Sequence, residues 1–470
     1  MSQGSKNHTT VYGQEKEIQW HINTGSNKIH AKRLPGRFRQ LKWMAASVWL
    51  LFFLGPYLRW GERQAVLLDI PNRQFHFFDL TVHPQDVWTL TFVMLFFATL
   101  LFMSTVLAGR AFCGYACFQT VWTDVFTWLE NTLEGPPKSR FQLDAAPWNA
   151  RKLSIKTIKH MLWILIAILT GVSFAAWFTD AFQLWRDYFT LQAHISAWIV
   201  LILFTTGTYV FAGFMREQVC MWLCPYARIQ GVMYDKNTLL PAYDEQRGEP
   251  RGNIDKSVAK FSGACVDCDQ CLAVCPTGID IREGQQVGCI TCGLCIDACD
   301  MVMNKLKQPI GLIRYASLNQ LNGHSGKPMF QRAPVWLAIV LIISSIISTI
   351  YGLNTMSEAE LSVIDSRKPM YVLMSDNSIQ NRFQIRIFNK SKQNQRYHIN
   401  VNGITEMRVE GTQKPLLVKS GKMATTTVTV RVKKDAIRQS LTPLIFNIRN
   451  TNAADAQPIE YKSMFKGPVT

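Results

Sequence analysis

Two runs of cysteine constrain this chain more than any other feature of its sequence. The first reads CVDCDQCLAVCP and begins at Cys265, the second reads CITCGLCIDACD and begins at Cys289, and both have the spacing C-x2-C-x2-C-x3-C. A [4Fe–4S] cluster needs four thiolates, and in two-cluster ferredoxins the fourth cysteine of each run ligates the other cluster. The runs therefore predict two [4Fe–4S] clusters, one held by Cys265, Cys268, Cys271 and Cys299, the other by Cys289, Cys292, Cys295 and Cys275.

Zinc sites and disulfide bonds are the alternatives for so many cysteines. Zinc ribbons use two C-x2-C pairs that lie farther apart, with no third cysteine inside each run. Disulfide bonds are rare in the reducing cytoplasm, where this segment is expected to lie. Pro276 follows the first run, as in the ferredoxin pattern, whereas Asp300 follows the second. This departure leaves all the ligands intact, so the segment predicts transfer of single electrons.

Long apolar runs place much of the remaining chain in a membrane. A membrane-spanning helix needs about 20 apolar residues, and four runs approach that length, with a shorter one before them. They predict a polytopic α-helical membrane protein with five spans, at residues 43–58, 87–108, 161–178, 195–215 and 335–353. The chain carries 50 Lys and Arg against 33 Asp and Glu, a formal net charge of +17. Because much of this excess lies in loops beside the apolar runs, where it sets orientation, no nucleic-acid partner is expected.

The charges of the loops predict the side of the membrane on which each part lies. Loop 109–158 is rich in Lys and Arg, whereas loops 61–85 and 179–194 are nearly balanced. The positive-inside rule then places the N-terminus and both cysteine runs in the cytoplasm, and the C-terminal region on the opposite side. The predicted domains are a basic N-terminal segment, four spans, a cytoplasmic dicluster ferredoxin-like domain, a fifth span and a C-terminal domain, at residues 1–42, 43–215, 216–334, 335–353 and 354–470.

The C-terminal region, residues 354–470, predicts an all-β domain. Apolar and polar residues alternate at 383–387, 397–401 and 428–432, and Asn-Gly and Ser-Gly pairs interrupt the pattern. Such alternation is typical of short antiparallel strands with one buried face. Several of these strands in about 100 residues indicate an immunoglobulin-like sandwich. Nothing in the pattern predicts catalysis, so we expect a docking or spacer role.

Four further cysteines form a repeat within the membrane part. Each half of the four-span region is followed by one C-x3-C pair with an arginine shortly before it, and the second pair lies 107 residues after the first. Three intervening residues put two thiols on one face of a helix, so the four would converge on one site. Soft thiolates favour Cu(I), zinc or a further iron–sulfur centre, whereas isolated buried cysteines are often only core residues. The residues are Arg110, Cys113 and Cys117 in the first half and Arg216, Cys220 and Cys224 in the second.

Over nearly its whole length the chain resembles the CcoG (FixG/RdxA) family, accessory proteins of cbb-type cytochrome c oxidase. The resemblance rests on the double cysteine motif and on ERQAVLLDIPNRQFHFF, AGRAFCGYAC, MREQVCMWLCPYAR, DEQRGEPRGN and GLIRYASLN. It implies a protein of the bacterial inner membrane with a periplasmic immunoglobulin-like domain, which reduces Cu(II) to Cu(I) in copper supply for oxidase assembly. The C-x-x-x-C-P pairs of the family fall on the four repeated cysteines, except that Phe118 stands in place of the first proline.

These observations predict an electron relay that ends on copper. An unidentified donor would reduce the clusters, and copper would be held at Cys113, Cys117, Cys220 and Cys224. Expected partners are membrane lipid, copper ions and the copper-handling proteins of oxidase assembly, and a homo-oligomer is left open. Two alternatives are a quinol-oxidising electron-transfer subunit, similar to the membrane ferredoxins of nitrate-reductase systems, and a non-enzymatic scaffold that senses redox state.

Overall fold

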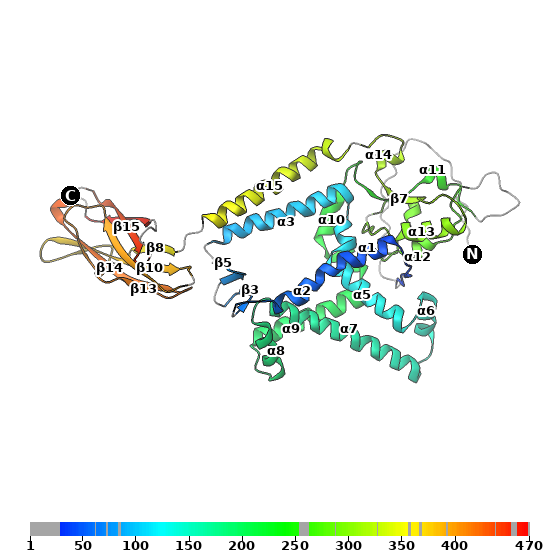
Figure 1. Cartoon of the computed structure of the whole chain (residues 1–470), viewed down its shortest axis with the longest axis horizontal. Coiled ribbons are helices and arrows are strands. Elements are labelled where there is room, and N and C mark those ends of the chain that lie inside the picture. Colours follow the sequence, from blue (N-terminus) through cyan, green and yellow to red (C-terminus); the bar gives the residue numbers. More distant parts are fainter. Residues whose placement is uncertain are drawn as a thin grey trace. The chain divides into compact units, whose positions relative to one another are not determined.

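The computed structural model forms two compact units, residues 1–349 and 350–470 (Figure 1). It describes residues 29–468 except 62, 72–73, 83–85, 253–262, 287, 327, 356–358, 366–368, 392, 438 and 453–457. Most of the predicted basic N-terminal segment, residues 1–28, therefore lies outside the described residues.

Among the described residues, four helices of the first unit and its boundary are long and apolar enough to cross a membrane. They are α3 (Val87–Ala108), α7 (Ala150–Ala176), α9 (Ile195–Val210) with its continuation η4 (Phe211–Met215), and α15 (Ala333–Asn354). Helix α7 begins well before the predicted residue 161, because Asn149 accepts a 2.8 Å hydrogen bond from the N–H of Lys152 and so caps the first turn. Helices α7 and α9 pack against each other (Figure 1). Gly171 permits this contact, since a Cβ there would lie 3.0 Å from the carbonyl oxygen of Leu201.

The shorter apolar run at 43–58 forms helical pieces rather than one α-helix. Its apolar side chains, among them Met44, Leu51 and Leu54, are exposed, as the side chains of a membrane-embedded segment would be. It is not among the four helices of spanning length in the described part of the chain, so the count of five spans stays a prediction. The pieces are α1 (Arg37–Ala46), η1 (Ser47–Trp49), α2 (Leu50–Leu54) and η2 (Gly55–Tyr57).

The loops between the long helices contain more regular structure than the sequence analysis predicted. Residues 59–82 form one two-stranded and one three-stranded antiparallel sheet. The amide of Gln64 links them to the ends of two helices, because it donates to the carbonyl oxygen of Ala176 at 3.0 Å and accepts from the N–H of Ala181 at 2.8 Å. The elements are β1 (Arg59–Trp60), β2 (Arg63–Gln64), β3 (Val66–Asp69), β4 (Gln74–Phe77), β5 (Leu80–Val82) and α8 (Ala181–Phe189).

Short helices follow the two C-x3-C pairs and surround the cysteine runs. Strand β6 (Leu240–Tyr243) precedes the cysteine runs in the sequence and strand β7 (Ile313–Ala316) follows them, and the two strands pair antiparallel. The short helices are α4 (Ala111–Tyr115), α5 (Phe118–Leu133), α6 (Pro137–Ala145), η5 (Val219–Leu223), α10 (Pro225–Val232), α11 (Glu245–Gly248), α12 (Gln270–Ala273), η6 (Ile281–Glu283), α13 (Leu294–Lys305), α14 (Leu318–Leu321) and η7 (Met329–Gln331).

Helix α1 is fastened to α13 by the side chain of Asp297. This carboxylate accepts hydrogen bonds from the backbone N–H groups of Phe38, at 3.2 Å, and Arg39, at 3.0 Å. It therefore caps the N-terminus of α1 from a distant part of the chain. Gly36 makes room for it, because a Cβ at that position would lie 2.3 Å from the Asp297 carboxyl carbon.

The second unit is a sandwich of two antiparallel sheets, as the period-two alternation predicts. The strand orders are β12-β14-β10-β8, with β9 also paired to β10, and β13-β11-β15-β16. Alternating residues such as Phe383, Ile385 and Val430 are fully buried between the sheets. The strands are β8 (Ala359–Asp365), β9 (Val372–Leu373), β10 (Ser378–Asn389), β11 (Gln395–Asn402), β12 (Arg408–Glu410), β13 (Leu416–Val418), β14 (Met423–Lys433), β15 (Leu441–Asn450) and β16 (Ile459–Lys466), with the short helix η8 (Lys434–Ala436) before β15.

Candidate iron–sulfur and thiol sites

The cysteines of the two runs line two adjacent cavities, each with an empty volume of about 360 Å³ that includes open solvent. In both cavities the fourth predicted ligand comes from the other run, so the fold brings together the crossed sets that the sequence predicts. Cys271 also borders the second cavity, which places the two sites side by side. One cavity is lined by Cys265, Cys268, Cys271 and Cys299, and the other by Cys289, Cys292, Cys295, Cys275 and Cys271.

The arrangement of the thiols fits a cluster better than a single metal ion. Among the described residues, no three His, Cys, Asp or Glu side chains converge closely enough to hold one ion. The four thiols of the repeat are among them, so a metal ion there would have to draw these thiols together on binding. Zinc would require sulfur atoms about 2.3 Å from a common centre. A [4Fe–4S] cluster instead binds each thiolate through its own iron at the corner of a cage, so more widely spaced thiols around one cavity suit it.

The backbone around the two runs repeats with an offset of 24 residues. Asp267 and Asp269, on either side of Cys268, have φ of 50° and 55°. Thr291 and Gly293, which flank the matching Cys292, have φ of 56° and 71°. Residues other than glycine seldom adopt this left-handed conformation, so the same unusual turn is imposed at the second cysteine of each run.

Arg282 holds the loop of the first run. Its guanidinium contacts the carboxylates of Asp267, Asp269 and Asp280, at 2.5, 2.6 and 2.6 Å. Hydrogen bonds to Asp280 are the main reason that the pKa of Arg282 is raised. The arginine thereby fixes the two left-handed aspartates beside Cys268. The sequence analysis missed Arg282, although the pair of aspartates within the first run was a signal for a cationic partner.

The first C-x3-C segment packs directly on the loop of the second cysteine run. The backbone N–H of Arg110 donates to the Thr291 hydroxyl at 3.1 Å, and the Tyr115 hydroxyl donates to the carbonyl oxygen of Cys292 at 3.0 Å. Between them, Gly114 lies so close that a Cβ would be 2.5 Å from the carbonyl oxygen of Ile290. Helix α4 therefore joins the membrane part to the run that begins at Cys289.

The second C-x3-C segment reaches the same run from η5. The methyl carbon of Met221 would lie 2.6 Å from a Cβ at Gly288, the residue before Cys289. Cys220 itself lines a third cavity together with Ile290 and Thr277. Both halves of the repeat thus contact one cysteine run, which only the tertiary structure reveals.

The four thiols of the repeat influence one another. The pKa of Cys113 is raised to about 12, mainly by burial and also by Cys117, Cys220 and Cys224, while Arg110 acts to lower it. Burial likewise raises the pKa of Cys220 to about 12. The Cys113 thiol donates to the side-chain oxygen of Gln230 at 3.2 Å. The thiols of Cys113 and Cys220 are therefore protonated at neutral pH when no metal is bound, and a metal would displace their protons.

The two thiols of each pair do not share one face of a continuous helix, contrary to the sequence analysis. Cys113 lies in α4 and Cys220 in the π-helical turn η5, whereas Cys117 and Cys224 have extended backbones with ψ of 131° and 107°. Pro225 explains the extended Cys224, because a proline disfavours helical conformation in the residue before it. Phe118 occupies the same first helical position after Cys117, so the turn survives the loss of proline.

The arginines of the two halves are also not equivalent. The residue 107 positions before Arg216 is Gly109, and both have a left-handed backbone, with φ of 46° and 57°. Gly109 ends α3 and Arg216 ends η4, each just before its cysteine pair. Arg110 therefore has no arginine counterpart, because the offset of 107 residues places it opposite Glu217.

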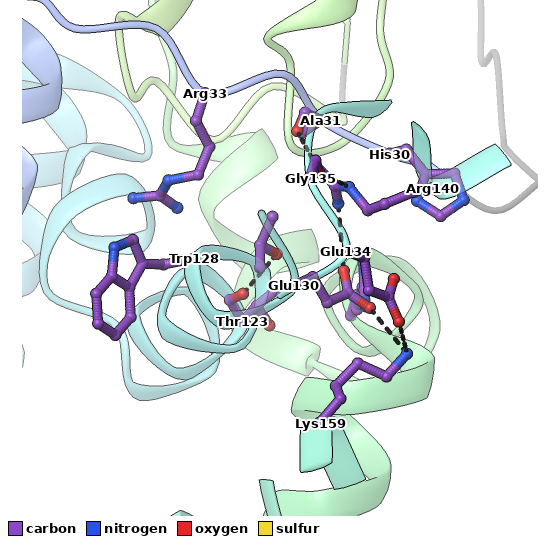
Figure 2. A network of polar contacts seen from close by, with 12 residues as sticks. His30, Ala31, Arg33, Thr123, Trp128, Glu130, Glu134, Gly135, Arg140 and Lys159 are labelled. Atoms are coloured by element: carbon purple, nitrogen blue, oxygen red, sulfur yellow. Dashed lines mark hydrogen bonds and ion pairs between the residues drawn. The ribbon is translucent and has the colours of Figure 1, made fainter. Parts of the chain in front are cut away.

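Arg216 belongs to a buried charge network that the sequence analysis did not find. Its guanidinium lies 2.7 Å from Glu130. Glu130 also contacts Arg140 at 3.3 Å and Lys159 at 3.8 Å (Figure 2). Lys159 continues to Glu134 at 2.8 Å. Because removal of one partner from a buried pair costs about 3–5 kcal/mol, this network holds α5, α6 and α7 in place beside the second C-x3-C segment.

Family models identify the class of protein that these sites define. A model for a 4Fe-4S dicluster domain matches residues 215–318, and a model for a 4Fe-4S binding domain matches residues 89–136, which include Cys113 and Cys117. A third, for the IG-like fold at the C-terminus of FixG, matches residues 349–468. The chain is therefore an iron–sulfur electron-transfer protein of the membrane, and the predicted [4Fe–4S] clusters and immunoglobulin-like fold are confirmed at this level.

Curated relatives give the family itself. Nitrogen fixation protein FixG of Rhizobium meliloti is 38% identical over 425 residues, which cover 82% of this chain and 81% of FixG. Protein RdxA of Cereibacter sphaeroides is 36% identical over 458 residues, which cover 93% of this chain and 97% of RdxA. The chain belongs to the FixG/RdxA family, as its motifs predicted.

Proposed function

We propose that this protein reduces Cu(II) to Cu(I) at the four thiols of the repeat, in copper supply for cbb-type cytochrome c oxidase. The observation that carries the proposal is the packing of Arg110, Gly114 and Tyr115 on residues 290–292. It brings the repeated cysteines next to the second cysteine run. When bound, the two clusters supply electrons one at a time, and each electron converts one Cu(II) substrate ion to Cu(I).

The arrangement of the sites in space supports one direction of transfer. The run at 289–299 packs against the first C-x3-C segment, and its cavity adjoins that of the first run, whose loop Arg282 holds. We infer that an external donor delivers electrons near Cys268, whose side chain is exposed. Cys113 is buried and the other three thiols are partly buried, and soft thiolates stabilise Cu(I) over Cu(II).

The decisive experiment is anaerobic copper reduction by the purified, cluster-loaded protein. The protein is reduced, freed of reductant and mixed with Cu(II), and Cu(I) is followed with a chelator. We expect reduction by the wild type and its loss in the variant Cys113→Ser/Cys117→Ser/Cys220→Ser/Cys224→Ser, with the cluster spectrum unchanged.

The other outcomes count against the proposal in different ways. Equal reduction by both proteins would remove these cysteines from the mechanism. If neither protein reduced copper but quinol reduced the clusters, a quinol-oxidising subunit would replace the copper reductase. Failure with both substrates would leave a redox-sensing scaffold.

We also propose a multi-pass orientation in the bacterial inner membrane with five spans, cytoplasmic clusters and a periplasmic β-domain. The positive loops support it, and so do the exposed apolar side chains of α1 and α2. Protease added to intact spheroplasts should digest residues 354–470 and spare the cysteine runs, and inverted vesicles should give the reverse. Digestion of the β-domain only in inverted vesicles would contradict this orientation.

A further inference from the structure

A third cavity lies where the span Ile195–Met215 ends. The segment before α1, helices α1 and α5, and the residues just after Met215 surround it, and the second cysteine run closes one side. Its empty volume is about 620 Å³, including the part open to solvent. The proposed electron path does not use its charged lining, which consists of Arg33, Arg39, Lys42, Asp124, Arg216 and Glu217.

The cavity carries more positive than negative charge. Arg33, Arg39 and Lys42 all turn to one carboxylate, Asp124, at 2.7, 3.0 and 3.6 Å. Burial alone would raise the pKa of Asp124, but the three cations lower it to about 2. One carboxylate therefore faces three cations. Burial also raises the pKa of Glu217, so this second acid offsets the excess less than an exposed glutamate would.

One of these cations has an unused hydrogen-bond donor. Arg39 is only 9% exposed, and its Nε is buried without a hydrogen-bond partner among the described residues. Lys42, one helical turn later in α1, is 2% exposed. An unsatisfied buried donor beside excess positive charge is costly. An oxyanion in the cavity would accept this hydrogen bond and neutralise part of the charge.

Exposed aromatic and apolar side chains flank the same group. Trp43 and Trp128 meet edge to face, with ring centroids 6.5 Å apart, and the Arg33 guanidinium lies 5.6 Å from the centre of the Trp43 ring. Figure 2 shows Arg33 near Trp128, a residue of α5. Trp43, Trp128 and Met44 are 39, 47 and 64% exposed. Tryptophan is enriched at the membrane–water interface, so the surface beside the cations suits acyl chains.

We propose that this cavity binds the phosphate of an anionic phospholipid, with Arg39 and Lys42 as the principal phosphate ligands and Trp43 and Trp128 beside the acyl chains. Basic pockets at the ends of membrane helices bind such headgroups. The two exposed tryptophans beside the cations favour a lipid over free phosphate. The bound lipid would fasten the segment before α1 to α5 and to the second cysteine run.

Native mass spectrometry of the full-length, cluster-loaded protein in detergent tests the proposal. Delipidated protein is titrated separately with phosphatidylglycerol, phosphatidylcholine and inorganic phosphate. We expect saturable binding of one phosphatidylglycerol, and binding about 30-fold weaker in the variant Arg39→Gln/Lys42→Gln, at roughly fivefold per cation. The matched control is Lys138→Gln/Arg151→Gln, which removes two exposed cations from the same predicted side and should bind like the wild type.

The remaining arms distinguish a bound lipid from free phosphate and from a purely electrostatic role of the two cations. The milder variant Arg39→Lys keeps the charge and guards against misfolding, and it should lose a smaller part of the affinity. Equal binding of phosphatidylcholine, or displacement of the lipid by inorganic phosphate, would overturn the proposal. Arg39 and Lys42 also lie within electrostatic reach of Cys292. If they serve only to offset cluster charge, the double variant would keep its lipid and show a lower cluster reduction potential, which would also overturn it.

Discussion

The contact between α4 and the second cysteine run predicts a sharp effect for Gly114→Ala. The new Cβ would lie 2.5 Å from the carbonyl oxygen of Ile290 and 3.1 Å from the Cα of Cys292. Both are backbone atoms that cannot rotate away, so the loop must retreat by about 0.9 Å to restore ordinary contact. Overpacking of this kind costs about 1–3 kcal/mol, whereas alanine in the short helix α4 regains at most about 1 kcal/mol.

The assay for Gly114→Ala combines stability and turnover in the cluster-loaded protein. We expect a lower midpoint for thermal loss of the iron–sulfur absorbance and a slower Cu(II) reduction, because the loop moves away from Cys113. Gly207→Ala in α9 is the matched control, since its Cβ would meet only Phe211, at 3.9 Å. Alanine there should leave both quantities at or above the wild-type values.

The refuting result is a Gly114→Ala protein that is as stable and as fast as the wild type. It would mean that α4 does not rest on residues 290–292. If the variant is less stable but reduces Cu(II) as fast as the wild type, the contact exists but does not belong to the electron path. Equal damage by Gly207→Ala would indicate a general intolerance of the substitution rather than the close approach at Gly114.

Three further predictions address the cluster ligands and the segment before α1. The variant Cys275→Ser/Cys289→Ser removes two ligands of one predicted cluster and should keep the iron of the other cluster. The variant Cys275→Ser/Cys265→Ser removes one ligand from each cluster and should lose the iron of both. Iron and sulfide analysis measures the outcome, and ligation within each run would give the opposite pattern. The pKa of Asp124 is about 2 in the folded protein, below the unfolded value of about 3.9. Ionised Asp124 therefore adds about 2 kcal/mol to the free energy of unfolding above pH 4, and this stabilisation is lost as the pH falls toward 2. Denaturant titrations followed by circular dichroism at several pH values should show that the free energy of unfolding falls more steeply with decreasing pH in the wild type than in Asp124→Asn. Equal pH dependence in the two proteins would contradict the ion pairs of Asp124. Asp297→Ala should weaken the cap of α1 by about 1 kcal/mol, seen as faster hydrogen exchange in its first turn, and unchanged exchange would argue against the cap.

Local patterns predicted the elements of this protein well. The alternation at 383–387 and 428–432 found strands whose apolar side chains are fully buried, because a strand exposes alternate faces. The apolar runs found all four helices of spanning length in the described residues, because bilayer thickness sets their length. Boundaries were less certain, as α7 shows, because a single cap at Asn149 extends the helix beyond its apolar part.

The details that depend on backbone turns were predicted less well. The thiols of each C-x3-C pair were expected on one helical face, yet Cys117 and Cys224 are extended. An arginine precedes each C-x3-C pair, but the backbone equivalent of Arg216 is Gly109 rather than Arg110. The small sheets at 59–82 were missed, because strands of two to four residues are too short for a periodic pattern.

The sequence by itself determined the chemistry of the centres, because the spacing C-x2-C-x2-C-x3-C already fixes how thiolates wrap a cluster. Only the tertiary structure decided that the C-x3-C segments pack against the loop of the second cysteine run. It also brought Glu130 to Arg216 and three cations to Asp124. Such contacts join residues distant in sequence, so they follow from how the elements pack, which no local pattern of residues encodes.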